Sequence, residues 1–433
     1  MCYISSRISE NGVMKLKKEL RCGIIGLGAR GAGLLKGCLI PMARDEKLMK
    51  LAAVCDLYAD RAKDAADTVE KAGLERPFET VDYRDILSRD DIDAVIVPAA
   101  WEAHIQIAVD AMKAGKYVGL EVGGAYSLED CWRLVHTSEE TGTHCMLLEN
   151  CCYGKRELMV LNMFRLGVLG EIVHCAGGYC HDLRDEISNG QENRHYRLRN
   201  YLNRNCENYP THELGPIAKL LDINNGNRIV SLSSTASCAR GLHEYIVKNR
   251  PESDPLTKAE FAQGDVITTV LKTKLGQTIV LTLDTTLPRA YSRGFTVRGT
   301  KGAYFEDTDS VFIDGRHNEF DFDQKKLWGN AAEFEEEYLH PLWKDYVPQG
   351  GHDGMDWMVL HAFCEAAGKN VRPPIDVYDA ALYMSITPLS EQSLAAGGAP
   401  VAVPDFTNGR WYMRNDIVDL DYSIDRKRKL IEE

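Results

Sequence analysis

The sequence predicts a two-part protein: an α/β Rossmann domain followed by an α+β domain with an open, mostly antiparallel sheet. Two observations lead to this prediction. Apolar runs alternate with helical segments through the first 150 residues, as in a parallel, doubly wound sheet. Beyond that point the apolar runs lengthen and take on the period of two that is typical of antiparallel strands.

The first part begins with a short apolar strand at Cys22–Ile25, followed by a helix expected from about Arg30 to Ala43. The next elements are interpreted in the same way, from apolar runs, helical periodicity and helix-ending glycines. Further strands are expected at 49–56, 92–100, 117–122 and 143–150, and helices at 57–73, 101–116 and 127–142.

The second part contains a helix, a set of strands and two closing helices. The helices are expected at 155–171, 353–368 and 376–398, and the strands at 171–181, 228–237, 265–274, 277–286 and 293–305. A loop rich in arginine and aromatic residues, 193–216, joins the first two of these strands. The boundaries predicted from these changes are an extension at 1–20, a first domain at 21–150, a second at 151–415 and a charged tail at 416–433.

A phosphate-binding turn is predicted between the first strand and the first helix. Gly26, Gly28 and Gly31 have the GxGxxG spacing, which lets the backbone approach a pyrophosphate at a helix N-terminus. Asp56 ends the next strand, where a carboxylate accepts hydrogen bonds from the adenine ribose and repels a 2′-phosphate. The predicted cofactor is therefore NAD, although Arg30 beside the glycines could contact a phosphate. The alternative is an ordinary turn in a sheet that binds no nucleotide.

The overall composition argues against several classes of partner. The formal net charge is -13, and an acidic surface repels nucleic acid and anionic membranes. No stretch approaches the roughly 20 apolar residues of a membrane span, and the N-terminus lacks the apolar run of a signal peptide. A cytoplasmic protein is expected. The 13 cysteines, an odd number with no CxxC pair, suggest buried thiols in a reducing compartment.

Several side chains follow strand ends in the first part, where Rossmann sheets bind their ligands. Trp101 and His104 come after the strand at 92–100, Glu121 and Val122 end the strand at 117–122, and Asn150 ends the strand at 143–150. Each is a candidate contact to the cofactor. Each also has an ordinary structural interpretation, as an aromatic residue near a helix start, a surface acid or a turn asparagine.

Two Tyr–His pairs stand out in the second part: Tyr179 with His181, and Tyr209 with His212. Histidine titrates near neutrality, and nearby cations can lower the pKa of a tyrosine, so such pairs can share proton transfers. Four arginines are close in sequence, at positions 194, 197, 199 and 204. The alternative is a core histidine beside a packing tyrosine.

The second pair lies in the stretch "NYPTHELGP", which precedes an expected helix. Pro210 stiffens the chain between the tyrosine and the histidine, and Pro216 is expected in the first turn of the helix, where its missing N–H costs little. No metal site is predicted, because no HExxH, His-x-His or Cys/His cluster occurs. No GxSxG motif occurs either, and no carboxylate pair stands out.

The chain resembles the glucose-fructose oxidoreductase / inositol dehydrogenase / MocA family, and within it glycoside hydrolase family 109. The likeness runs from Arg21 to about Asn415. The segments that carry it include "WEAHIQIAVDAMKAGK", "LLENCCY", "GGYCHDLR", "HYRLRNYLNRN", "NYPTHELGP", "DGMDW", "MSITPLSE" and "PDFTNGRW".

Two departures from the ordinary oxidoreductases of that family favour the glycosidase branch. Those enzymes carry Glu-Lys-Pro at the end of the fifth strand, where the lysine helps to deprotonate the substrate hydroxyl. This chain has Glu121, Val122 and Gly123 instead. They also tend to have an aspartate four residues before the active-site histidine, where this chain has Asn208.

The resemblance implies an unusual hydrolysis. NAD+ takes a hydride from C3 of the sugar, and the resulting ketone acidifies the C2 proton. Loss of that proton expels the leaving group from C1, water adds to the enone, and the hydride returns. The cofactor ends unchanged, so a nucleophilic carboxylate is not needed.

The resemblance also implies site residues. Those implied to contact NAD are Ala29, Arg30, Asp56, Trp101, His104, Glu121, Val122 and Asn150, together with the glycine turn. Those implied to contact the sugar are Tyr179, Arg197, Tyr209, Pro210, Thr211, His212 and Tyr291, with Tyr209 also near the cofactor. The expected roles are His212 as base for the C3 hydroxyl, Tyr179 as base at C2, and His181 serving the leaving group.

The leading substrate implied is an α-N-acetylgalactosaminide. The alternatives are other α- or β-hexosides cleaved by the same mechanism, a sugar 3-dehydrogenase with net NADH formation, or an NAD-sensing protein without catalysis. Family resemblance further implies a homo-oligomer, a dimer or tetramer, formed through the outer face of the second sheet.

Overall fold

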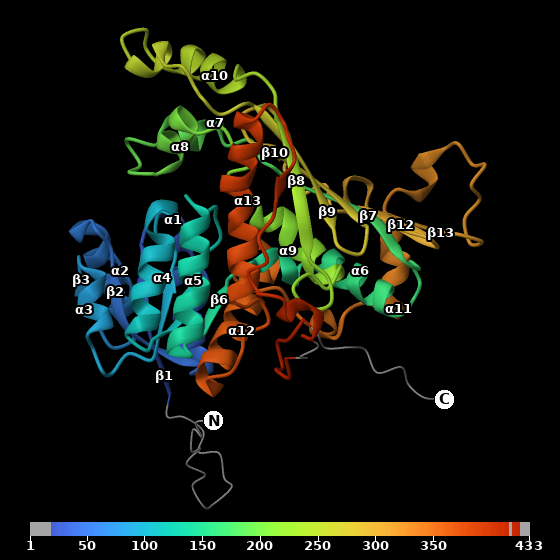
Figure 1. Ribbon diagram of the computed structural model, residues 1–433. Helices are drawn as coiled ribbons and strands as arrows, with labels where there is room; N and C mark the ends of the chain where they lie inside the picture. The colour runs from blue at the N-terminus through green and yellow to red at the C-terminus, as the bar shows by residue number, and fades with distance from the viewer. Residues whose placement is uncertain (1–18, 415–417, 425–433) are drawn as a thin grey trace, which may run out of the picture.

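The computed structural model describes residues 19–414 and 418–424. These residues form two sheets, with a parallel sheet in the first part and a larger, mostly antiparallel sheet in the second (Figure 1). Helices from the end of the chain return to pack between the two parts. No helix among the described residues is long and apolar enough to cross a membrane.

The first sheet has six strands in the order β3-β2-β1-β4-β5-β6, all parallel. This is the Rossmann strand order, and it confirms the predicted fold class. The strands are β1 (Leu20–Ile25), β2 (Met49–Cys55), β3 (Phe78–Thr80), β4 (Ala94–Val97), β5 (Tyr117–Leu120) and β6 (Cys145–Leu147). The helices of this part are α1 (Ala29–Leu34), α2 (Ala59–Lys71), α3 (Tyr83–Leu87), α4 (Trp101–Lys113) and α5 (Leu128–Thr141).

Three features of the first part differ from the sequence prediction. The short strand β3 and helix α3 were not expected, because neither segment is long enough to show a periodic pattern. The helix expected from Arg30 to Ala43 is α-helical only to Leu34 and continues as π-helical turns at Leu35–Leu39 and Met42–Glu46. Helix α5 lies where it was expected, with Ser127 as its N-cap accepting a hydrogen bond from the backbone of Asp130.

The second sheet has eight strands in the order β13-β12-β11-β7-β10-β9-β8-β14. Only β7 and β10 pair in parallel, so the prediction of a mostly antiparallel sheet is confirmed. The strands are β7 (Ile172–Cys180), β8 (Ile229–Ala236), β9 (Val266–Thr273), β10 (Thr278–Asp284), β11 (Thr296–Gly299), β12 (Gly302–Phe305), β13 (Ser310–Ile313) and β14 (Val401–Ala402). The single strand expected at 293–305 is thus the hairpin β11–β12.

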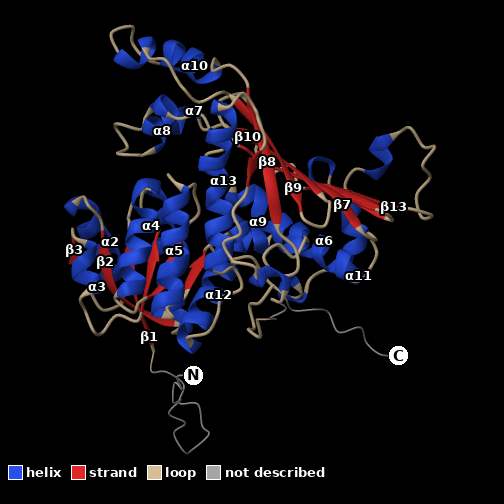
Figure 2. Ribbon diagram, in the orientation of Figure 1, coloured by secondary structure: helices blue, strands red, loops and turns tan. Residues whose placement is uncertain are grey.

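Helices line one face of this sheet, where α9 packs against β7 and β10 and α13 packs against β8 (Figure 2). The helices of the second part are α6 (Lys155–Arg165), α7 (Arg184–Ser188), α8 (Arg197–Asn203), α9 (Thr211–Leu220), α10 (Gly241–Asn249), α11 (Glu335–Tyr338), α12 (Met355–Lys369) and α13 (Val377–Ala395).

Helix α13 joins the two parts. It packs against α5 and β6 of the first part and against β8, β14 and α9 of the second. A β-carbon on Gly124 would lie 2.2 Å from the Thr387 hydroxyl, so the first part meets α13 at a position where only glycine fits. This close packing fixes the strand ends of the first sheet against α9 of the second part.

The start of α9 differs from the sequence prediction. The helix begins at Thr211 with Pro210 as its N-cap, so His212 lies in the first turn and Pro216 lies inside the helix rather than in its first turn. A proline there cannot donate to the carbonyl four residues earlier, which belongs to His212. The opening turn of α9 therefore carries the candidate histidine directly beside the first sheet.

The cysteines behave as expected from their composition. Eleven of the twelve in the described residues are buried, only Cys238 is exposed, and none of these twelve is paired in a disulfide.

Candidate active site

The glycine turn has the close backbone approach that its spacing predicts. Gly26 has φ +108°, and a β-carbon there would lie 2.7 Å from the backbone of Ala99. A β-carbon on Gly31 would lie 1.9 Å from the carbonyl oxygen of Gly26. By contrast, a β-carbon on Gly28 would meet only the Arg61 side chain, at 3.6 Å. Two glycines therefore pack the turn, while Gly28 leaves its surface open to a ligand, which fits a dinucleotide pyrophosphate.

Asp56 lies at the end of β2 beside this turn and is buried. Its two oxygens accept hydrogen bonds from the backbone N–H groups of Leu27, at 2.6 Å, and Tyr58, at 2.9 Å. A carboxylate can accept about four hydrogen bonds, so it can hold the turn and still accept ribose hydroxyls. The position fits the role predicted from sequence.

Arg30, which could have contacted a phosphate, is held by carboxylates instead. Its guanidinium lies 2.8 Å from Glu121 and 2.8 Å from Asp356, at the start of α12. Burial opposes ionisation of Asp356, but hydrogen bonds from His352 and Arg30 hold the pKa of this carboxyl well below its usual value. Asn150 donates to the same carboxylate at 2.8 Å. Two predicted cofactor residues, Arg30 and Asn150, thus meet at one aspartate that was not expected from the sequence, and Glu121 joins them through Arg30.

Trp101 and His104 lie in the first turn of α4 and are both buried. Burial lowers the pKa of His104 to about 4, so the neutral ring donates from Nε2 to the carbonyl of Ala99 at 2.5 Å. Within the described residues, His104 Nδ1 and Trp101 Nε1 are buried without a hydrogen-bond partner. A β-carbon on Gly123 would lie 2.3 Å from the Trp101 ring, so the indole occupies the space beside the buried Val122.

His212 is paired with a buried carboxylate. Its Nδ1 lies 2.6 Å from Oε1 of Glu149, which is fully buried and also accepts a hydrogen bond from the Cys151 backbone at 3.0 Å. Burial opposes ionisation of Glu149, but its interaction with His212 and the hydrogen bond from the Cys151 backbone outweigh it and hold the pKa of Glu149 below its usual value. Because a carboxylate only accepts, Nδ1 carries the hydrogen and Nε2 is left as the basic nitrogen.

Two tyrosines, Tyr209 and Tyr179, lie against the His212 ring, and they in turn contact Trp101 and His181. The Tyr209 hydroxyl lies 3.5 Å from His212 Nε2, and the Tyr209 ring centre lies 4.4 Å from that of Tyr179 and 5.6 Å from that of Trp101. The Tyr179 hydroxyl lies 3.3 Å from Nδ1 of His181. The two Tyr–His pairs therefore form one cluster.

The tyrosines do not have the lowered pKa values that the nearby arginines suggested. Burial raises the pKa of Tyr179 to about 12, and Arg197 offsets only part of this effect. Burial also raises the pKa of Tyr209 well above its usual value. Burial and Arg197 lower the pKa of His181, which favours the neutral form of its ring. Desolvation outweighs the arginine because both phenols lie in the protein interior.

Arg197 and Tyr291 complete the cluster. Arg197 is buried, pairs with Glu186 at 2.7 Å, and lies 5.0 Å from the ring centres of Trp101 and Tyr209. Tyr291 is half-exposed and lies 5.2 Å from His181, ring centre to ring centre. The residues brought together around one point are Trp101, Tyr179, His181, Arg197, Tyr209, His212 and Tyr291, while Asp56 and the glycines lie at the cofactor turn.

Sequence analysis missed Glu149 and Asp356. Glu149 is the next-to-last residue of the run "CMLLEN", directly before Asn150, so its place after a strand could have indicated it. Asp356 lies in the segment "DGMDW", but no local pattern connects it with Asn150, which lies more than 200 positions earlier in the chain.

One group of potential metal ligands occurs among the described residues: Glu149, Cys151 and His212, with ligand atoms within 4.8 Å of one another. Glu149 and His212 are hydrogen-bonded to each other, and Arg293 donates to the Cys151 sulfur at 3.4 Å. A guanidinium beside the thiol opposes a metal cation. The group is therefore better described as a hydrogen-bonded His–Glu pair beside a buried thiol.

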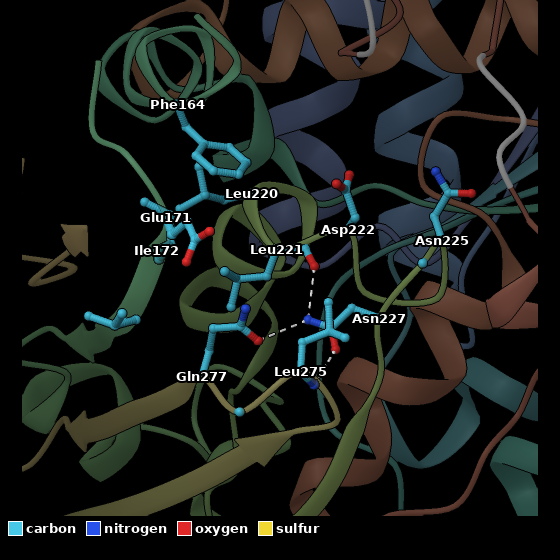
Figure 3. A pocket seen from close by; sticks show the side chains of 13 residues that line it. Phe164, Glu171, Ile172, Leu220, Leu221, Asp222, Asn225, Asn227, Leu275 and Gln277 are labelled. Carbon is cyan, nitrogen blue, oxygen red and sulfur yellow. Dashed lines mark hydrogen bonds between the residues drawn. The ribbon is translucent and has the colours of Figure 1, made fainter. Parts of the chain in front are cut away.

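A cavity of about 440 Å³ lies elsewhere, at the far end of α9 (Figure 3). Apolar side chains such as Phe164 and Leu275 line it together with Glu171, Asp222 and Asn227. The Asn227 amide donates to Gln277 and to the Leu221 carbonyl, so it is committed to structure. None of the predicted site residues lines this cavity.

Both parts of the chain match known protein families. Residues 153–413 match the family described as glycosyl hydrolase 109, C-terminal domain, and residues 20–148 match the oxidoreductase family with an NAD-binding Rossmann fold. The domain at the glycine turn is thus an NAD-binding domain, and the cofactor prediction is confirmed.

Curated relatives match over nearly the whole chain. A glycosyl hydrolase family 109 protein from Stenotrophomonas maltophilia is 39% identical over 444 residues, which cover 96% of this chain and 95% of the relative. An alpha-N-acetylgalactosaminidase from Tannerella forsythia is 37% identical over 421 residues, covering 91% of this chain and 88% of the relative.

Solved structures share the fold at lower identity. An inositol dehydrogenase homolog complexed with NAD+ from Azotobacter vinelandii has a TM-score of 0.65 and 17% identity, covering 90% of this chain and 99% of that one. A levoglucosan dehydrogenase in complex with NADH and levoglucosan has a TM-score of 0.65 and 19% identity, covering 90% of this chain and 100% of that one. At these identities the likeness supports the fold alone.

Proposed function

Because the chain belongs to glycosyl hydrolase family 109, we propose that this NAD-dependent glycosidase cleaves its substrate by transient oxidation at C3 and elimination across C1–C2. The leading substrate is an α-N-acetylgalactosaminide, a proposal supported by the relative from Tannerella forsythia. The observation that carries the mechanism is the His212–Glu149 pair, a base oriented by a buried carboxylate next to the cofactor-side Trp101 and Tyr209.

The residues available to hold NAD are the glycine turn, Asp56 and the cluster at Asp356. When bound, NAD would accept a hydride from C3 of the sugar and later give it back. We assign residues 21–150 chiefly to this task and residues 151–415 chiefly to the sugar, with Asp356 of the second part supporting the cofactor side through Arg30 and Asn150.

His212 performs the first proton transfer. Its Nε2 accepts the proton of the C3 hydroxyl while Nδ1 stays hydrogen-bonded to Glu149. The carboxylate stabilises the positive charge that develops on the ring, as in other carboxylate–histidine pairs. Because the lysine of the ordinary oxidoreductases is absent at Val122, this task falls to His212 alone. The same nitrogen returns the proton when the ketone is reduced again.

Tyr179 and His181 perform the second transfer together. Tyr179 is a neutral phenol, because burial raises its pKa to about 12. It can take the C2 proton only if its own proton moves on, and the neutral His181 Nδ1 lies 3.3 Å from its hydroxyl. The imidazolium then formed can protonate the departing oxygen at C1. Water supplies the hydroxyl at C1 and the new proton at C2, so the atoms balance.

Arg197 and Tyr291 are proposed to bind the sugar. The Arg197 guanidinium is held by Glu186 against the Trp101 and Tyr209 rings, which leaves it rigid beside the cluster. Tyr291 is half-exposed next to His181 and can cover the sugar or its aglycone. The backbone of Pro210 and Thr211 sets the direction of His212 at the start of α9.

A panel of nitrophenyl glycosides, assayed with and without added NAD+, tests this function. We expect release of nitrophenol from α-N-acetylgalactosaminide, no steady accumulation of NADH, and loss of activity after NAD is removed. The second candidate is a sugar 3-dehydrogenase, which the dehydrogenase-like fold allows. Steady NADH formation without nitrophenol would select that candidate and reject the glycosidase.

Replacement of Tyr179 with phenylalanine should block exchange at C2 while sparing oxidation at C3. The ring keeps its packing against Tyr209, but the hydroxyl that relays the C2 proton to His181 is lost. The measurement is deuterium incorporation at C2 of the sugar in heavy water, together with single-turnover NADH absorbance.

Tyr291→Phe is the matched control, because Tyr291 loses the same hydroxyl at the edge of the cluster. We expect it to raise KM and to keep C2 exchange. Rapid C2 exchange in Tyr179→Phe would remove Tyr179 from the relay.

A further inference from the structure

Residues 191–199, which we call the strap, cross from one side of the cofactor region to the other. The strap follows α7 and runs into α8, and in Figure 1 this green segment lies above α1 and α4 of the first part. It touches the first part at both ends. One contact set lies near the glycine turn and Asp56, and the other lies at Trp101 on α4.

The first contact set centres on Tyr58, two residues after Asp56. Arg194 of the strap forms two hydrogen bonds to Asp60, at 3.0 and 2.7 Å, and its guanidinium lies 4.3 Å from the Tyr58 ring centre. Arg61 lies 5.0 Å from the same ring and donates from Nη2 to the Asn193 carbonyl at 2.8 Å. Two guanidiniums, one from each part, therefore stack on one tyrosine.

The strap backbone is shaped for this contact. Arg194 has φ +52°, a left-handed conformation that costs free energy in a non-glycine residue. The turn around it is closed by hydrogen bonds from His195 N–H to the Gly190 carbonyl, at 2.7 Å, and from Asn193 N–H to the Asn189 carbonyl, at 2.9 Å. The closed turn holds Arg194 in a strained conformation and places its side chain against the first part. We infer that this turn has a functional role.

The second contact set lies at the catalytic end. The Tyr196 ring centre lies 4.6 Å from that of Trp101 and 4.4 Å from that of His195, which stacks on it. Arg199 pairs with Glu102, the residue after Trp101. The strap is thus fastened on both sides of the glycine turn.

Arg61 connects the strap to the turn itself. Its Nη1 lies 3.6 Å from the position that a β-carbon on Gly28 would occupy, while Nη2 holds the strap carbonyl. The open surface above Gly28 is therefore bounded by a guanidinium that is tied to the strap.

We propose that Arg61 and Arg194 form a binding site for the AMP half of NAD, and that the strap is a latch that must open before the cofactor leaves. Guanidiniums suit this ligand, because they bind phosphate oxygens through charge-assisted hydrogen bonds and stack on planar rings. The latch rests on the proposed function, because a reaction that returns NAD unchanged does not require the cofactor to exchange.

The test measures NAD release in the absence of sugar. The full-length protein is loaded with NAD, and both the NAD retained after size-exclusion chromatography and the first-order release rate are measured. We expect Arg61→Gln and Arg194→Ala to weaken NAD binding and to speed release by about ten- to a hundredfold, the scale of a lost hydrogen bond to a charged group. Arg199→Ala removes the ion pair with Glu102 at the other end of the strap. It should speed NAD release several-fold with little change in the rate of NAD association.

Arg84→Ala is the matched control. Arg84 also stacks on a tyrosine, Tyr83, and pairs with an aspartate, Asp82, but it does not contact the strap. It should release NAD at the rate of the unaltered protein. Unchanged release in both Arg194→Ala and Arg199→Ala would overturn the latch, as would an unaltered protein that retains no NAD on the column. Failure of glycoside cleavage would leave these rates unaffected, so the two proposals can fail separately.

Discussion

Replacing Glu149 with glutamine should lower kcat by about a thousandfold or more, the scale seen when a carboxylate that orients a catalytic histidine is lost. Glutamine keeps the size of the side chain but presents an NH2 group that donates. The hydrogen on His212 Nδ1 then moves to Nε2, and the ring can no longer accept the proton of the C3 hydroxyl. The 2.6 Å contact between residue 149 and His212 Nδ1 favours a hydrogen on Nδ1 in the unaltered protein. In the glutamine variant the same contact favours a hydrogen on Nε2.

Three measurements separate orientation from structural damage. Nitrogen NMR of His212 should report the change of tautomer, NAD affinity should stay the same, and the loss should appear in kcat rather than KM. The matched control is Glu46→Gln, because Glu46 contacts His361 at 2.7 Å in a similar pair that is not part of the catalytic cluster. An active Glu149→Gln enzyme with an unchanged His212 signal would contradict the role of Glu149.

Replacing His212 with alanine should reduce turnover by about a hundredfold or more, the usual contribution of a positioned base. The C3 hydroxyl then has no acceptor for its proton, so both oxidation and the return step slow. NAD should remain bound, because the glycine turn and Asp56 lie outside this cluster. The measurements are nitrophenol release, single-turnover NADH formation and retained NAD.

Three further variants control for misfolding and test whether Glu149 and His212 act together. His212→Ala leaves the fully buried Glu149 without its partner, which is destabilising, whereas His212→Asn keeps a donor for that carboxylate and should be equally inactive. His136→Ala removes an exposed histidine of α5 and should keep full activity. The double variant of Glu149 and His212 should be no slower than His212→Ala, because the two residues act as a unit. Near-normal rates in both His212 variants would remove α9 from the mechanism.

The fold followed from patterns that are local in sequence. Strand β1, the glycine spacing and Asp56 all lie within one βαβ unit, so alternation and spacing were enough to predict a Rossmann sheet with an NAD site. The short β3 and α3 escaped prediction because three to five residues cannot show a period. Pro216 was placed in a first turn because the sequence does not fix where α9 begins.

Local sequence patterns indicate which residue types the protein brings to its chemistry: a glycine turn, an acid at the end of the next strand, and two Tyr–His pairs. The tertiary structure decided how they combine. Glu149 orients His212 across 63 positions of sequence, and Asp356 holds Arg30 across 326, because strand ends and a returning helix meet at one edge. The same packing raises the pKa of Tyr179 instead of lowering it, since burial of the phenol outweighs the charge of Arg197. Pairing and burial depend on which distant segments meet, and no local pattern records that.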